Sequence, residues 1–207
     1  AEASQGSLQA FFEFQTQIAR LTGLDIANAS LYDGATAVAE AALLATNTTR
    51  RKEVLVASTM HPEYIAVLRT VLSDVDIKIT MLDATDGIIS PATVEAKMSD
   101  KVAGVIVQSP NIWGQIEDWD GCFEKAHSVP KTAGIAVFNP IACGMLKTPG
   151  ACGADIAAGE GQPLGNALNL GGPYLGLLAA KESYTRKMPG RLVGMTTDEE
   201  GRRVFWN

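Results

Sequence analysis

The residues best suited to hold a ligand form a short turn, Asp33, Gly34, Ala35 and Thr36. The alanine-rich stretch of residues 37–45 that follows is typical of a helix. A turn of small residues at a helix start directs free backbone N–H groups and the positive helix end at one point, which suits an anion. The alternative is that Asp33 only caps the helix and Gly34 only relieves the turn. Tyr32, beside the turn, favours a binding role.

His61 is a second candidate, because it precedes Pro62 at the predicted start of a helix and follows a predicted strand. An imidazole there could stack on a planar cofactor or carry protons. It could equally serve only as the residue that starts the helix. His127 lies near a predicted helix end, where a cation suits the dipole, and we assign it no function. Two histidines this far apart, with no carboxylate at ligand spacing, predict no metal site.

Polar or glycine-rich residues follow the other predicted strands. They are residues 108–111, Asn139 with Pro140, and the segment 159–166. So much glycine in the last segment indicates sharp turns or a close backbone approach. The chain has neither a Gly-x-Ser-x-Gly elbow nor a phosphate-loop lysine, so we predict no catalytic nucleophile.

The elements that position these residues alternate along the chain. Apolar residues recur at helical spacing between Ser4 and Gly23. Further helices are predicted near residues 62–72, 91–98 and 122–127, and strands at 54–58, 77–82, 104–108, 135–139, 155–158 and 175–180. This alternation predicts an α/β fold with a mostly parallel sheet and helices on both faces. Ligands of such sheets bind at the carboxyl ends of the strands.

Composition excludes several function classes. The 207 residues suit one domain, and the net charge of −6 offers no basic face for nucleic acid. No apolar run approaches the length of about 20 residues that spans a membrane, so we expect a soluble, cytoplasmic protein. The three cysteines lack Cys-x-x-Cys spacing, and we expect reduced, buried thiols. The missing initial Met and the apolar end at Val204, Phe205 and Trp206 suggest a piece of a longer protein.

Several long motifs together resemble the glycine cleavage system P-protein family, glycine dehydrogenase (decarboxylating), and in particular its first-subunit type. The motifs cover residues 4–6, 28–36, 61–64, 146–150, 153–156, 159–165, 171–174 and 189–194. The resemblance spans essentially the whole chain. It implies the large domain of the pyridoxal phosphate-dependent aminotransferase-like fold (fold type I), as a single domain over residues 1–207 without its N-terminal arm and C-terminal small domain.

The resemblance also implies that two cofactor roles are empty. In this fold the Schiff-base lysine lies on the turn after the strand predicted at 155–158, but no lysine occurs between Lys147 and Lys181. Gln162 and Pro163 stand in that slot, and neither can form an imine. Asn139 stands where an Asp would pair with the pyridine nitrogen, and an amide supplies no negative charge.

By the same resemblance, Gly34, Ala35 and Thr36 correspond to a vestigial phosphate cup, and His61 lies near the position of a cofactor-stacking residue. Tyr32 and Asp33 are the first candidates to face an active site, followed by His61 and Asn139. No catalytic residue is assigned to this chain, and no pyridoxal phosphate is expected to be bound covalently to it.

The family implies two partners. One is glycine dehydrogenase subunit 2, which carries the lysine and the pyridoxal phosphate in a two-plus-two heterotetramer. The other is the lipoylated H-protein, which accepts the aminomethyl group after glycine loses carbon dioxide. We keep two other interpretations open: a stand-alone pyridoxal phosphate transferase or lyase that uses Lys147 or Lys181, and a non-enzymatic α/β interaction domain.

Overall fold

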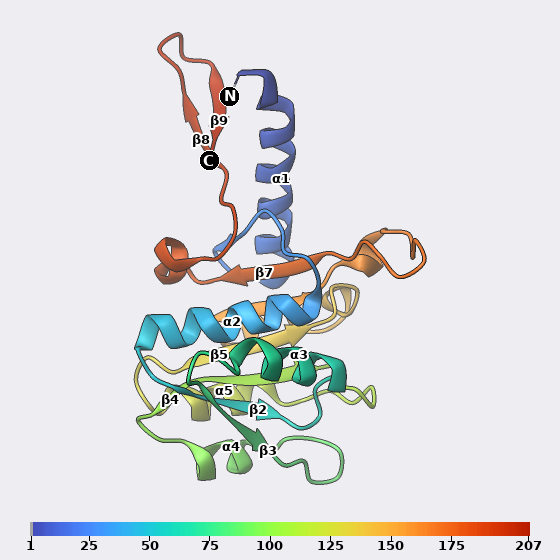
Figure 1. Cartoon of the computed structure of the whole chain (residues 1–207), viewed down its shortest axis with the longest axis vertical. Coiled ribbons are helices and arrows are strands. Elements are labelled where there is room, and N and C mark those ends of the chain that lie inside the picture. Colours follow the sequence, from blue (N-terminus) through green and yellow to red (C-terminus); the bar gives the residue numbers. More distant parts are fainter. Residues whose placement is uncertain (1) are drawn as a thin grey trace.

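The computed structural model of the chain describes residues 2–207. Its centre is a seven-stranded sheet in the order β1-β7-β6-β5-β4-β2-β3 (Figure 1). The strands are β1 (Ile26–Ala27), β2 (Glu53–Ala57), β3 (Lys78–Leu82), β4 (Val102–Ser109), β5 (Ala133–Phe138), β6 (Ile156–Glu160) and β7 (Gly176–Ala180). β2 to β6 are parallel to one another, whereas β7 runs antiparallel to both β6 and β1. The predicted α/β fold with a mostly parallel sheet is therefore confirmed.

Helices cover both faces of this sheet. They are α1 (Gln5–Thr22), α2 (Gly34–Thr49), α3 (Pro62–Leu72), α4 (Pro91–Lys97) and α5 (Trp119–His127), with short 3-10 turns at Glu2–Ser4, Ala142–Gly144, Gly150–Cys152, Gln162–Leu164 and Glu182–Lys187. α2 and α3 share one apolar core with the sheet. Side chains of α1, α4 and α5 form the core on the other face.

Most predicted elements are confirmed within a few residues, because each strand of the sheet interior is continuously apolar. All six residues of β5 and all five of β7 are buried. The pattern did not predict β1, which has only two residues, or the hairpin of β8 (Gly194–Thr197) and β9 (Arg203–Trp206). Cys122 and Cys152 are buried as expected, whereas Cys143 is only partly buried.

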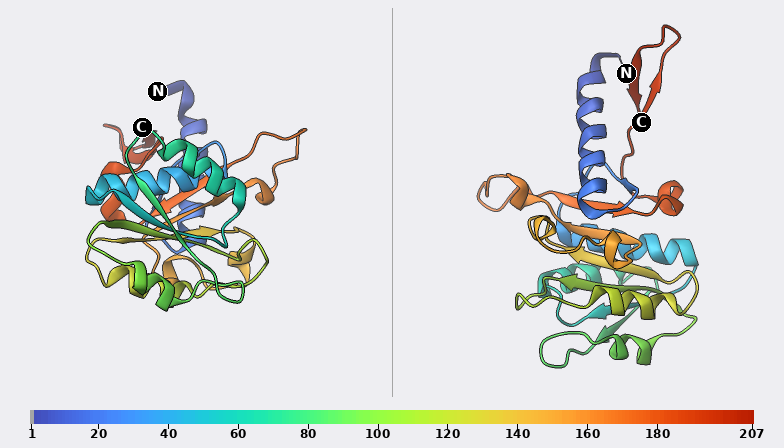
Figure 2. Two further views of the ribbon diagram at one scale, coloured as in Figure 1. Left: turned by 60° about the horizontal axis from the view of Figure 1, so that its bottom comes forward. Right: turned by 180° about the vertical axis from the view of Figure 1, so that it is seen from behind.

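α1 extends away from the sheet, and the β8-β9 hairpin lies beside its outer end (Figures 1 and 2). Leu8 packs there with Val193 and Phe205 in a small separate core. At its inner end the helix stops at Gly23, whose left-handed φ of 69° lets its N–H bond back to Ala19 and Arg20. Gly23 thus ends α1 at the residue where the helical spacing of apolar residues ends in the sequence.

A buried carboxylate ties together the amino edge of the sheet, opposite the edge where ligands bind. Asp155 accepts hydrogen bonds from Lys181 Nζ at 2.6 Å and from the Gly134 N–H at 2.8 Å, and it contacts His127 Nε2 at 2.7 Å. Burial disfavours its ionisation, but these partners outweigh burial and hold the pKa of Asp155 below its ordinary value. His127 and Lys181 therefore have a structural role here.

We expect Asp155→Asn to lower the free energy of unfolding at neutral pH by about 1–3 kcal/mol, because the buried side chain loses its charge and with it the charge-assisted contacts to the partly exposed Lys181 and His127. A depressed folded-state pKa stabilises the protein fully above the unfolded-state value and loses that effect as the pH falls through the folded-state value. The difference between wild type and variant should therefore shrink as the pH falls below about 4. Urea titrations at several pH values measure it.

Asp120→Asn is the matched control. Asp120 pairs with Lys147, but its side chain is 57% exposed, so solvent screens the interaction. We expect little change in stability at any of these pH values. Equal losses for both variants would contradict the structural role of Asp155.

Candidate functional site

The first turn of α2 is held by a capping box. Asp33 Oδ1 accepts the Thr36 N–H at 2.8 Å, and the Asp33 N–H lies 3.3 Å from Thr36 Oγ1. The helix is largely buried against the sheet, because most of its buried residues are small alanines. The capping role considered for Asp33 is thus present.

A second carboxylate, from the end of β6, also accepts an N–H of this first helical turn. Glu160, the last residue of β6, accepts the Gly34 N–H at Oε2, 2.8 Å away. Its other oxygen, Oε1, accepts the N–H groups of Gln162 at 2.8 Å and Leu175 at 2.9 Å. The residues that resemble a phosphate cup therefore already face an anion that belongs to the chain.

Tyr64 closes the same corner from α3. A Cβ on Gly34 would collide with the Tyr64 hydroxyl and come within 2.9 Å of the Glu160 backbone N, so only glycine fits there. Burial, reinforced by the charges of Glu160 and Asp33, raises the pKa of Tyr64 to about 12. The phenol consequently stays neutral at physiological pH.

Beside this corner lies a cavity of about 270 Å³ at the carboxyl edge of the sheet. It brings together several residues that sequence analysis placed at that edge, namely His61, Gln108, Asn111, Asn139, Glu160 and Pro163. Asp83 belongs to the same edge but is exposed and pairs with Lys97 instead. The topology thus gathers strand ends that are far apart in sequence.

Several polar atoms that line this cavity are hydrogen-bonded to the backbone of the chain itself. His61 Nδ1 accepts the Glu63 N–H at 3.2 Å, and its ring lies 5.2 Å from that of Tyr64, tilted by 35°. Gln108 accepts the His61 N–H and donates to the Pro110 carbonyl. Asn139 Oδ1 accepts the Ile141 N–H at 2.9 Å. These side chains shape loops and helix starts.

Tyr32 lies apart from the cavity, and 87% of its surface is exposed. The part of the chain that the structure describes contains no cluster of three or more His, Cys, Asp or Glu side chains able to hold a metal ion. None of the helices within residues 2–207 combines the length and the hydropathy that crossing a membrane would require.

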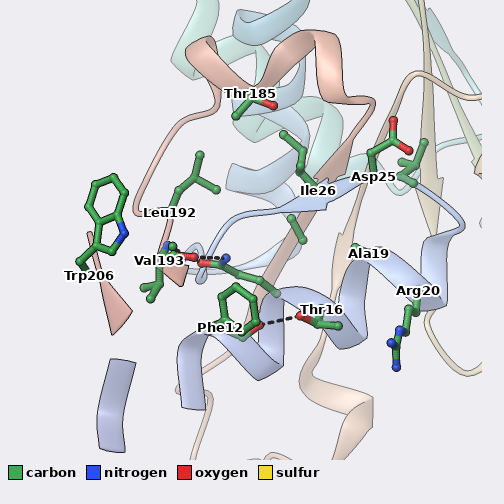
Figure 3. Close-up of a pocket in the computed structure, with 14 residues that line it drawn as sticks. Phe12, Thr16, Ala19, Arg20, Asp25, Ile26, Thr185, Leu192, Val193 and Trp206 are labelled. Atoms are coloured by element: carbon green, nitrogen blue, oxygen red, sulfur yellow. Dashed lines mark hydrogen bonds between the residues drawn. The ribbon is translucent and has the colours of Figure 1, made fainter. Parts of the chain in front are cut away.

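A second concavity, a groove of about 560 Å³, lies between α1 and the segment leading to β8 (Figure 3). Phe12, Leu192 and Trp206 line it. The side-chain amide of Gln15 donates to the Val193 carbonyl at 3.1 Å and accepts the Val193 N–H at 2.9 Å. Arg20 and Asp25 are its charged residues. Its lining brings no set of reactive groups together, so the cavity at the sheet edge is the candidate site.

Comparison with known proteins identifies the family. The family model described as "Glycine cleavage system P-protein" matches residues 1–206. The chain belongs to this family. A solved structure of glycine decarboxylase (P-protein) of the glycine cleavage system, in inhibitor-bound form, superimposes with a TM-score of 0.93 at 50% identity, over 99% of this chain and 46% of that one.

Several curated relatives carry the name probable glycine dehydrogenase (decarboxylating) subunit 1. The protein of Desulforamulus reducens is 54% identical and that of Moorella thermoacetica 50% identical, each over 99% of this chain and 46% of the relative. The chain thus spans about half the length of these relatives. A Listeria monocytogenes protein provisionally assigned as an L-allo-threonine aldolase shares the fold alone, with a TM-score of 0.66 at 14% identity.

These relatives establish the fold of pyridoxal phosphate enzymes of fold type I, yet the residues of this chain do not fit that cofactor. Gln162 and Pro163 follow β6 where the resemblance places the lysine slot, on the short turn Gln162–Leu164. The N–H of Gly34, in the corresponding phosphate cup, is taken by Glu160. We therefore derive no step of chemistry through a cofactor on this chain.

Neither Glu160 nor Tyr64 was singled out from the sequence, although the sequence contains a signal for the first. Glu160 is a charged residue at the end of an apolar strand, between two glycines. Such a residue must find partners close to the backbone that follows it. Which N–H groups those are depends on the packing of α2 against β6, which the sequence pattern does not contain.

We expect Gly34→Ala to destabilise the protein by about 2 kcal/mol, because the added methyl overlaps Tyr64 and the backbone of Glu160. Gly6→Ala is the matched control, since Gly6 also lies in the first turn of a long helix and a Cβ there meets nothing within 4 Å. That variant should be neutral or slightly more stable. Thermal unfolding of both variants tests the close approach, and equal behaviour would contradict it.

Proposed function

We propose that this chain is part of subunit 1 of glycine dehydrogenase (aminomethyl-transferring) of the glycine cleavage system. In this proposal the assembled enzyme decarboxylates glycine and transfers the aminomethyl group to the lipoylated H-protein, which makes it an oxidoreductase. Pyridoxal phosphate is held by subunit 2, in a cytoplasmic heterotetramer with two copies of each subunit. Residues 1–207 act as one large domain that supports the partner's active site.

The proposal rests on one combination: the chain is similar to first subunits, and its own carboxylate fills its anion position. Two of the first-subunit relatives are 54% and 50% identical across this chain, and the position for a ligand anion holds the carboxylate of Glu160. A chain this similar to first subunits, whose anion position is filled by its own carboxylate, fits a subunit that shapes the active site of its partner.

The lysines that a stand-alone enzyme would need are both engaged elsewhere. Lys181 Nζ lies 2.6 Å from Asp155 at the amino edge of the sheet, opposite the cavity. Lys147 pairs with Asp120 on the first turn of α5 and does not line the cavity. Neither position supports an imine with a ligand at the carboxyl edge.

Exposed apolar side chains support a partner at this edge. The connections that follow β1, β4, β5 and β6 carry large apolar residues open to solvent, among them Tyr32, Trp113, Ile141, Met145, Leu168 and Leu170. Leu170 is fully exposed at a left-handed φ of 57°, on the loop that projects beside β7 (Figure 1). Exposed large apolar side chains gathered at one edge are a feature of protein interfaces, and we assign this edge to subunit 2.

The decisive test is borohydride reduction with pyridoxal phosphate followed by intact mass, on this chain alone and with the second subunit. We expect the added mass on the partner alone, because this chain has no lysine at the cavity. Mass on a lysine of this chain would establish a stand-alone enzyme. Absence of glycine decarboxylation in the complex would favour a pure interaction domain.

A second prediction concerns Tyr32, which we propose faces the partner's active site. We expect Tyr32→Ala to lower the rate of glycine decarboxylation by about tenfold or more while assembly stays intact, because a misplaced contact near reacting groups is costly. Tyr32→Phe is the control, since it keeps the ring and removes only the hydroxyl. Unchanged kinetics in Tyr32→Ala, with the complex intact by gel filtration, would remove Tyr32 from the site.

A further inference from the structure

The N–H groups that surround Glu160 come from three separate segments. Gly34 is the first residue of α2, Gln162 begins a 3-10 turn, and Leu175 directly precedes β7. Their N–H groups lie between 2.8 and 2.9 Å from the two carboxylate oxygens. Convergent backbone N–H groups of this kind form an anion site whatever the source of the anion.

The anion in this site cannot leave, because it is covalently part of β6. The carboxylate itself occupies the position to which the three N–H groups point, and on the helix side an added methyl on Gly34 would overlap Tyr64 and the backbone of Glu160. Asp33 caps the same helix turn and adds a second carboxylate nearby. A phosphate dianion approaching this corner would therefore meet both steric overlap and like charge.

We propose that the Glu160 carboxylate is an internal substitute for an oxyanion ligand and excludes phosphate-bearing molecules from the N-terminus of α2. This exclusion is a property of Glu160 in the folded chain and does not depend on which reaction the assembled protein performs. Removal of the side chain leaves three N–H donors directed at one vacancy, which then accepts a free oxyanion.

The same carboxylate couples the anion site to the base of the projecting loop. Oε1 joins the two ends of residues 161–175, where the Gly161 N–H also donates to the Leu175 carbonyl at 2.6 Å. Occupancy of the site by any oxyanion should therefore hold both α2 and this loop in place. Loss of the anion should loosen both.

The test is thermal unfolding of the full chain as Glu160→Ala, with and without inorganic phosphate. We expect the variant to melt about 4–8 °C lower than wild type, because three charge-assisted hydrogen bonds are lost. Phosphate at up to about 20 mM should restore about 2–4 °C in a saturable manner, by binding only the folded state. Sodium chloride at matched ionic strength should not, and wild type should show no saturable gain.

Two further variants keep the test decisive. Glu160→Gln fills the same space, so it should fold, melt below wild type and gain nothing from phosphate. Glu124→Ala removes an exposed carboxylate of α5, on the opposite face of the sheet from α2, and it controls for the change in net charge. If Glu160→Ala is unfolded in buffer, recovery of a cooperative transition with phosphate is the expected result.

Failure of phosphate to stabilise Glu160→Ala, or equal stabilisation of wild type, would overturn the proposal. Neither result would alter the assignment of the cofactor to subunit 2, because the reduction experiment tests that separately.

Discussion

The burial of α2 is the constraint on which the rest of the site depends. Its many small residues, mostly Ala, let the helix lie close to the sheet, and ten of its sixteen residues are buried. A buried helix start has N–H groups that water cannot satisfy, so they need partners within the molecule. Asp33 accepts the N–H of Thr36, and Glu160 accepts that of Gly34. Glu160 also holds the turn after β6 and the base of the projecting loop, and Tyr64 packs against the same corner.

The two edges of the sheet have opposite characters. At the amino edge, Asp155 joins α5 and the end of β7 through side-chain contacts to His127 and Lys181, and it joins β5 through a hydrogen bond from the Gly134 N–H. At the carboxyl edge, Glu160 accepts three backbone N–H groups, and large apolar side chains are open to solvent. This exposed apolar surface is the basis of the proposed contact with a partner subunit.

The fold that this chain shares with its family does not by itself determine the chemistry of its site. The sheet order, the two helical layers and the glycine-rich turn are those of relatives in the P-protein family. Fold alone does not assign chemistry, because the same layers can hold an occupied or a filled site. In this chain the residue at the end of β6, Glu160, fills the site. Glu160 converts a turn that suits an anion into one that already has one.

The sequence by itself determined the alternation of strands and helices, the ends of α1 and α3, the missing lysine and the family, because these depend on local periodicity, caps and residue identity. The antiparallel direction of β7, the two-residue β1 and the partners of Glu160 were decided only by the tertiary structure. The contacts of Gly34 with Glu160 and of β1 with β7 join segments more than a hundred residues apart, and the direction of β7 beside β6 depends on the loop between them. Contacts of these kinds leave no periodic trace in the chain.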